Sequence, residues 1–192
     1  MTLTVKQYRK KYNLTMKQLR QRVAKDILQW LNLKKIKAGS GIFVELASLN
    51  YEFGETCFEH INRINNTDAK TAIKDIKQCS VCAIGAITLC MIDRFNSLNL
   101  GDVRDQHNHE SSYLNQIFTK RQLEWIESFF ECANYTPDTK PHLYNYWDTF
   151  GLLKPEERMR RIFKHVAKYG DFITKVFMKE NSITNINKFI GE

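Results

Sequence analysis

From Cys79 to Ile92 the chain has 14 consecutive residues without a charge, and most of them are apolar. A helix needs about 20 apolar residues to span a bilayer, so this run is too short for a membrane segment. A helix that is apolar on nearly all sides has to be buried, because none of its faces is suited to water. We therefore predict a buried central helix over Cys79–Phe95, around which the other elements pack.

Glycine and proline are scarce along the chain. The 192 residues include 8 Gly and 3 Pro, which is about half the usual share of these two residues. A turn-rich β sandwich needs more of both, so the composition favours a mainly α fold in a single helical domain. One stretch departs from this pattern. The turn signal of Lys37–Gly41 is followed by Ile42–Leu46, which predicts one short β element near 42–46.

Start and stop signals for helices recur along the sequence. Thr15 followed by Gln18, and Thr119 followed by Gln122, match the capping box that opens a helix. Pro155 suits the first turn of a helix that Gly170 would end in a left-handed conformation. Apolar residues at helical spacing also predict helices over 52–65 and near 69–76.

These signals divide the chain into three parts. We expect a basic helical N-terminal segment, 1–37, that packs on a helical core, 38–180. A frayed tail, 181–192, follows the core.

Positive charge is concentrated at the N-terminal end. Residues 1–40 contain eleven Lys and Arg but a single acidic residue, Asp26, and so carry a net charge of +10, whereas the whole chain carries +8. Such a segment favours an anionic partner, either nucleic acid or an acidic protein surface. The alternative is a solvated helical face that keeps the protein in solution. The residues that we expect to contact the anion are Lys10, Lys11, Lys17, Arg22 and Lys25.

Five cysteines and an N-terminal end without an apolar leader favour reduced thiols in a cytoplasmic protein. Four residues have the spacing of a zinc site: Cys57 and His60 form one pair, and Cys79 and Cys82 form a second pair after 18 intervening residues. The alternative is that these are small side chains buried between packed helices. We expect no cofactor unless this set binds zinc.

Cysteine catalysis is a second possible chemistry. Cys79 or Cys82 at a helix N-terminus would have a stabilised thiolate, because the helix dipole favours negative charge there. A base would come from one of the histidines, and the sequence selects none of them. The alternative is a core cysteine without reactivity. The candidate bases are His107, His109, His142 and His165.

The segment Asp105–Glu110 carries two of these histidines and could bind a metal, or it could be an exposed polar loop. The sequence has no phosphate-binding glycine loop, no serine elbow and no dinucleotide fingerprint.

Four blocks of sequence together resemble a loose set of short hypothetical proteins from bacteria and bacteriophages. They are Arg22–Leu28 with Ile36–Phe43, Cys79–Ala86, Phe118–Glu131, and the helix that carries Arg158, Ile162, Val166 and Gly170. The resemblance covers roughly residues 22–173, and its most specific part is Val-Cys-Ala-Ile-Gly-Ala, residues 81–86. It implies a phage or mobile-element context and supplies no catalytic residue.

A second resemblance covers Tyr8–Arg20, which looks like the opening of a repressor-type helix-turn-helix domain. In such a domain a recognition helix follows the second helix after a short turn. Here the apolar pattern of the second helix continues through Ala24, Ile27 and Leu31, which departs from that arrangement.

The sequence as a whole favours a small, non-enzymatic, phage-related accessory protein. It would bind nucleic acid or an acidic protein through its basic N-terminal helices, in the cytoplasm of the host if a phage encodes it, and it would have no membrane partner. Two alternatives remain open. One is a phage-encoded inhibitor of a host system, and the other is a zinc-stabilised or cysteine-dependent enzyme.

Overall fold

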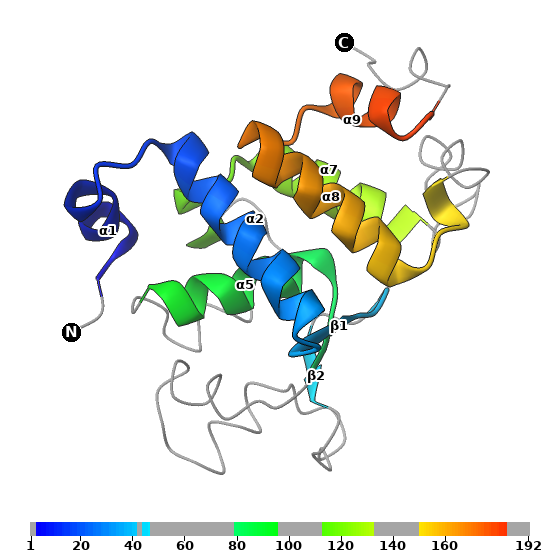
Figure 1. The fold of residues 1–192 in the computed structure, drawn as a ribbon, viewed down its shortest axis with the longest axis horizontal. Helices are drawn as coiled ribbons and strands as arrows, with labels where there is room; N and C mark the ends of the chain where they lie inside the picture. Colours follow the sequence, from blue (N-terminus) through cyan, green and yellow to red (C-terminus); the bar gives the residue numbers. More distant parts are fainter. Residues whose placement is uncertain (1–2, 42–43, 47–78, 96–112, 133–149, 184–192) are drawn as a thin grey trace.

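A computed structural model describes residues 3–41, 44–46, 79–95, 113–132 and 150–183, and it is mainly α as predicted. The predicted helices over 52–65 and near 69–76 and the segment Asp105–Glu110 lie outside the described residues. The elements in chain order (Figure 1) are α1 (Val5–Lys11), α2 (Met16–Asn32), β1 (Ile36–Ala38), β2 (Val44–Leu46), β3 (Cys79–Val81), α5 (Ala83–Arg94), the 3-10 helix η2 (Tyr113–Gln116), α7 (Lys120–Glu131), α8 (Pro155–Tyr169) and α9 (Thr174–Glu180).

Helices α2 and α8 lie side by side and form the centre of the helical packing, with α5 and α7 behind them in Figure 1. The two helices run antiparallel. At one end Gln21 Nε2 donates to the carbonyl of Lys168 (3.1 Å), and at the other Arg160 Nη1 donates to Asn32 Oδ1 (2.7 Å). The side of α2 that faces the core is apolar; its buried residues are Leu19, Val23, Ala24, Ile27, Trp30 and Leu31.

Three short strands form one small mixed sheet beside the helices. β3 is the central strand, parallel to β1 and antiparallel to β2, with Ile36 opposite Cys79 and Val44 opposite Val81. β2 corresponds to the predicted β element near 42–46. β1 was not predicted from the sequence, and it crosses the predicted boundary between segments 1–37 and 38–180. That division stays a prediction.

The prediction of one continuous helix over Cys79–Phe95 is wrong at its start. Residues Cys79–Val81 form β3, and the helix, α5, covers Ala83–Arg94. A short apolar run has no periodicity that separates a buried strand from a buried helix. Strands β1 and β2 flank this segment on both sides, so its backbone groups pair with them instead of with a helical turn. The burial was predicted correctly, because every residue from Ala83 to Ile92 is buried.

The predicted starts of α2, α7 and α8 and the predicted end of α8 are confirmed. Thr15 and Gln18 form a reciprocal capping box at α2, and Thr119 and Gln122 form one at α7. Pro155 is the first residue of α8, and Gly170 ends that helix with φ at 71°. The capping boxes and Gly170 satisfy backbone N–H or C=O groups that a helix end leaves without partners, and Pro155 removes one such N–H.

A buried arginine ties the sheet to the far end of α7. Arg158 is 2% exposed, and its guanidinium donates to the backbone carbonyls of Phe130, Gly151 and Leu153 and to the hydroxyl of Ser40. A buried charge is tolerated when its donors are satisfied in this way. The three carbonyls and the hydroxyl therefore fix how α7, α8 and the end of β1 meet.

Within the described ranges, no helix combines the length and the apolar character that crossing a membrane would require.

We expect Gly170→Ala to destabilise the protein. A Cβ at this position would lie 2.8 Å from the carbonyl oxygen of Lys17 and 2.3 Å from its Cγ, and the backbone has a positive φ. The left-handed conformation costs a non-glycine residue roughly 1–2 kcal/mol, and an overpacked contact adds about 1–3 kcal/mol. Urea denaturation should show a loss of about 2–5 kcal/mol in the free energy of unfolding.

Asn13→Ala is the matched control. Asn13 is exposed and has φ at 48°. Alanine at this position therefore has the conformational cost of a positive φ, but its side chain lies in solvent. Asn13→Ala should lose less free energy of unfolding than Gly170→Ala. Equal losses would show that the contact between Gly170 and Lys17 contributes nothing.

Candidate nucleic-acid interface

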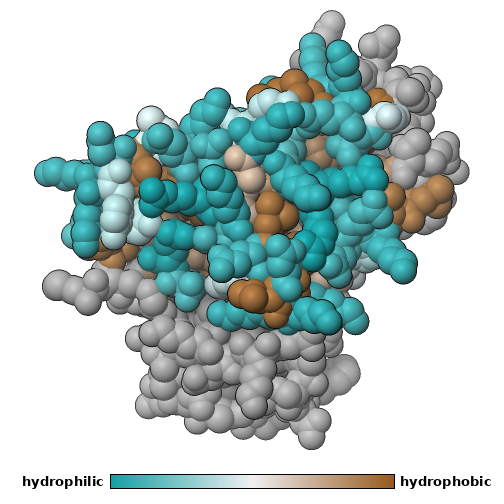
Figure 2. All heavy atoms as spheres, viewed as in Figure 1, coloured by the Kyte–Doolittle hydropathy of each residue, from teal (hydrophilic) through white to brown (hydrophobic). Residues whose placement is uncertain are grey.

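The solvent-facing side of α2 carries cations and amides. Lys17 and Lys25 are exposed, Arg22 is half-buried, and Gln18 and Gln29 are exposed between them. Lys25 lies at the centre of this side, and Lys17 and Arg22 lie on its two flanks, because successive helical residues are rotated by about 100°. Figure 2 shows the face over α2 and α8 covered mainly by hydrophilic residues. We call this side of α2, together with the exposed lysines of α1, the basic surface.

The one acid of the N-terminal segment is neutralised. Asp26 lies on the flank of α2 and accepts hydrogen bonds from Nε and Nη2 of Arg94 on α5. Burial is the largest influence on Asp26 and raises the pKa of its carboxyl, while the hydrogen bonds from Arg94 act in the opposite direction. Its charge is thus matched by an arginine from elsewhere in the fold, so Asp26 does not offset the positive charge of the lysines of α2.

Helix α1 is attached beside α2 through Tyr8. The phenol oxygen accepts from Arg94 Nη1 (2.6 Å) and from Arg22 Nη1 (3.2 Å), and the ring packs edge-on against Phe95 (5.2 Å between centroids). Lys10 and Lys11 occupy the exposed last turn of α1. The exposed lysines of α1 are therefore held beside the flank of α2 that carries Arg22.

The five predicted contact residues differ in the interactions that they form within the protein. Among the described residues, Lys10, Lys11, Lys17 and Lys25 form no ion pair with a carboxylate. Arg22, by contrast, donates to Tyr8, and its guanidinium lies 5.8 Å from the ring centroid of Tyr12. It holds α1 in place and adds positive charge.

Arg20 has a structural role that the sequence did not reveal. It donates to the carbonyls of Gly170 (2.6 Å) and Ile117 (2.8 Å) and to Asp171 Oδ1 (2.5 Å). Its side chain is only 12% exposed. Arg20 therefore joins α2 to the end of α8 and to the segment before α7.

The zinc prediction concerns two residues that the structure describes and two that it does not. Cys79 is buried in β3, and Cys82 caps α5 by accepting the N–H of Gly85 at 3.3 Å. Cys57 and His60 lie outside the described residues. No group of three or more His, Cys, Asp or Glu side chains within the described ranges is placed to hold a metal ion. A zinc site would thus require Cys57 and His60, and it stays a prediction.

Cys82 lies at a helix N-terminus, as the hypothesis of cysteine catalysis requires, but its environment opposes the thiolate. Burial is the dominant cause that raises the pKa of its thiol to about 12, and the hydrogen bond from Gly85 only partly offsets this effect. Glu131, which is 8% exposed, raises it further by charge repulsion. Burial also raises the pKa of Cys90.

His165 is the one candidate base within the described residues, and its two ring nitrogens are both engaged. Nε2 accepts the N–H of Ile173 (3.2 Å), which places the proton on Nδ1, 2.8 Å from Glu180 Oε2. Its side chain is 1% exposed. We interpret His165 as a structural link between α8 and α9. The other predicted bases, His107, His109 and His142, lie outside the described residues.

Helix α2 runs without a break from Met16 to Asn32. The extended second helix is therefore as the sequence indicated, and within the described residues no recognition helix follows α2 after a short turn.

No protein-family model matches the chain, and no curated protein and no solved structure shows a significant similarity to it.

We expect the described cysteines to be unreactive in the folded protein. All four are buried, and the raised pKa of Cys82 and Cys90 leaves those two thiols with little nucleophilic thiolate at neutral pH. A Cys57→Ser chain should react with a chromogenic disulfide reagent only as fast as the protein opens, and quickly after denaturant is added. Rapid reaction of the folded variant at mildly acidic pH would instead reveal an activated thiol.

We expect protonation of His165 to weaken the fold. Burial lowers the pKa of His165 below its ordinary value of 6.5, although the hydrogen bond to Glu180 acts in the opposite direction. As the pH falls, the unfolded chain therefore binds a proton on His165 at a higher pH than the folded protein does. The contribution of neutral His165 to stability is complete above pH ~6.5 and is lost as the pH falls below that value. Urea denaturation between pH ~7.5 and ~5 should show the free energy of unfolding decreasing.

His165→Asn is the comparison for this experiment. Asn keeps a donor near the position of Nδ1 and has no titrating group, so its curve should be flatter over the same range. Glu180 adds little in this window, because its ordinary pKa of 4.5 lies below the window and hydrogen bonds from Tyr169, His165 and Lys168 lower its pKa in the folded protein to about 2. Parallel curves for the two proteins would contradict the assignment of this pH dependence to His165.

Proposed function

We propose that this protein is a small non-enzymatic accessory protein that binds nucleic acid through the basic surface of α1 and α2. The observation that carries the proposal is the set of exposed lysines that lack carboxylate partners among the described residues, namely Lys10, Lys11, Lys17 and Lys25. The one acid of α2, Asp26, is paired with Arg94 and does not pair with any of them.

Phosphate is the anion that such a surface suits. Exposed lysines attract a phosphate backbone and release its counterions, which supplies affinity without selecting a sequence. Gln18 and Gln29 add uncharged donors between the cations, and side-chain amides commonly bind phosphate or sugar oxygens. The expected binding is therefore sensitive to salt and tolerant of sequence.

The unreactive surroundings of Cys82 support a binding role over a cysteine-dependent enzyme. The resemblance to short bacterial and bacteriophage proteins supports a phage or mobile-element context, with the host cytoplasm as the place of action. An acidic protein surface, such as the target of a phage-encoded inhibitor, would be attracted by the same lysines. The experiment below separates the two kinds of partner.

We expect Lys17→Gln/Lys25→Gln to weaken nucleic-acid binding and to reduce its salt dependence. For duplex DNA the logarithm of affinity falls with the logarithm of salt by about 0.9 for each phosphate that is neutralised. Removing two contacts should reduce the slope by about 1.8. The measurement is fluorescence anisotropy of labelled random-sequence DNA and RNA at several salt concentrations.

Lys154→Gln is the matched control. Lys154 is exposed and precedes α8, at the opposite end of that helix from Gly170, so it lies away from Lys17. Its affinity and slope should equal those of the unmodified protein. If the unmodified protein binds neither DNA nor RNA at low salt, the nucleic-acid proposal fails and an acidic protein becomes the favoured partner. If the control and the double variant behave alike, the assigned surface is wrong.

A further inference from the structure

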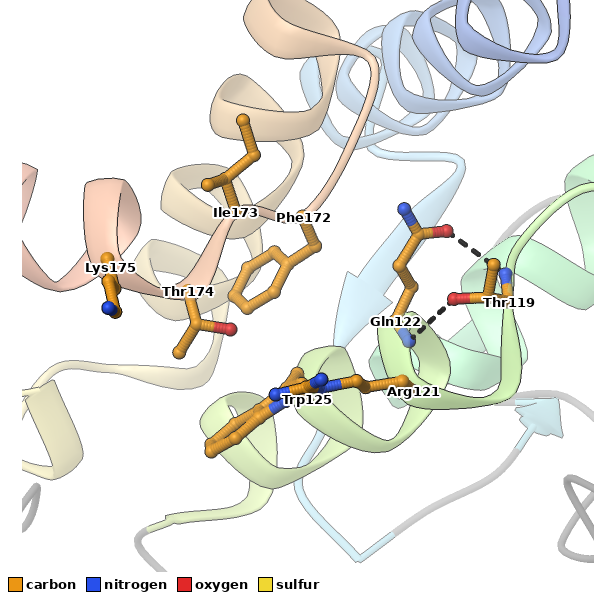
Figure 3. Close-up of a pocket in the computed structure, with 8 residues that line it drawn as sticks. All are labelled: Thr119, Arg121, Gln122, Trp125, Phe172, Ile173, Thr174 and Lys175. Atoms are coloured by element: carbon orange, nitrogen blue, oxygen red, sulfur yellow. Dashed lines mark hydrogen bonds between the residues drawn. The ribbon is translucent and has the colours of Figure 1, made fainter. Parts of the chain in front are cut away.

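A pocket of about 350 Å³ opens between the start of α7 and the segment that joins α8 to α9. Figure 3 shows its lining side chains coming from these two regions, which are about 50 residues apart in the sequence. The lining residues on which the argument depends are Arg121, Gln122, Trp125, Phe172, Thr174 and Lys175.

Two aromatic rings supply the apolar walls of the pocket. Trp125 and Phe172 each pack against Phe129, with ring centroids 5.9 Å and 5.6 Å apart. Phe129 is itself fully buried and also contacts Phe177. The two walls are therefore fixed by the hydrophobic core, while Trp125 remains partly open to solvent. A rigid, partly exposed indole is a suitable face for stacking a flat ring.

Two cations lie at the pocket, and no carboxylate is among the lining residues that the structure describes. Arg121 and Lys175 are both exposed, and within the described residues neither forms an ion pair. Thr174 contributes a hydroxyl group beside Phe172 (Figure 3). The pocket thus combines aromatic walls with positive charge, which suits a flat ring linked to an anion.

The pocket lies next to the basic surface. Asp171 accepts from Arg20 on α2 (2.5 Å) and from Gln122 in the pocket lining (2.9 Å). The backbone of Gly170 lies against the side chain of Lys17, and Phe172, two residues further on, lines the pocket. Gly170 and Asp171, whose carboxylate is paired with Arg20, therefore connect the start of α2, where Lys17 lies, to the pocket.

Sites for single-stranded nucleic acid combine these same two elements, a cationic path for the backbone and aromatic side chains on which bases stack. A duplex keeps its bases paired and stacked, so it could use the basic surface but could not fill the pocket. We propose that the pocket holds one unstacked base of a single-stranded nucleic acid, against Trp125, with the neighbouring phosphates on Arg121 and Lys175. This inference rests on the proposed function and names its preferred substrate.

The test compares two single-stranded oligomers of equal length, one of thymidylates and one abasic, by anisotropy and by quenching of tryptophan emission. Stacking on one aromatic side chain changes affinity by roughly tenfold. The thymidylate oligomer should therefore bind about tenfold tighter than the abasic one and should alone quench the emission. Trp125→Phe should keep most of this preference because it retains an aromatic face, whereas Trp125→Leu should remove it. Arg121→Gln should reduce the salt slope by about 0.7.

The outcomes separate this inference from the proposed function. Equal affinity for the two oligomers, with Trp125→Leu unchanged and Lys17→Gln/Lys25→Gln weakened, would overturn the pocket and leave the basic surface standing. Binding of neither oligomer would overturn the pocket, and it would overturn the proposed function as well if the labelled random-sequence DNA and RNA also fail to bind. The comparison of oligomers on the unmodified protein needs no variant, so it decides the question even if Trp125→Leu does not fold.

Discussion

The guanidinium of Arg20 is the contact on which the arrangement of the surface and the pocket depends. It binds two backbone carbonyls and one carboxylate, which belong to the end of α8 and to the segment before α7. Gly170 makes this junction possible, because a side chain there would collide with Lys17. The start of α2, the end of α8 and the start of α7 therefore meet at one corner. The lysines of α2 and the aromatic pocket are neighbours for that reason.

Arginine and lysine have different roles in the N-terminal segment. Arg9, Arg20 and Arg22 all donate hydrogen bonds within the protein, to Leu14, Gly170 and Tyr8 respectively. The lysines of α1 and α2 are exposed. A planar guanidinium can satisfy several acceptors at once, whereas an ammonium group is strongly hydrated and stays in water. The arginines consequently hold the surface together, and the lysines give it its charge.

The sequence predicted features that depend on local chemistry and missed those that depend on distant partners. The capping boxes at Thr15 and Thr119 and the end of α8 at Gly170 were correct, since each involves residues a few positions apart. The strand Cys79–Val81 was predicted as helix, because only the flanking strands determine its conformation.

The same limit applies to the candidate site. Exposure of Lys17 follows from the helical pattern, but the structural role of Arg20 depends on Asp171, which is 151 residues away. Trp125 and Phe172 look like core residues in the sequence, and only the folded chain shows that they border a pocket. In the sequence, Arg121 and Lys175 do not differ from other surface cations. Only the fold brings the start of α7 and the start of α9 together and places both cations at one pocket.

The network around Arg158 limits how this chain can be divided. Its acceptors Ser40 and Phe130 precede residues 133–149, whereas Gly151, Leu153 and the arginine itself follow them. A break between these parts would leave the C-terminal fragment with a guanidinium that has lost two of its acceptors, and the N-terminal fragment would lack the donor. The two fragments would then complement each other. They would reassociate through these hydrogen bonds and would not act as independent modules.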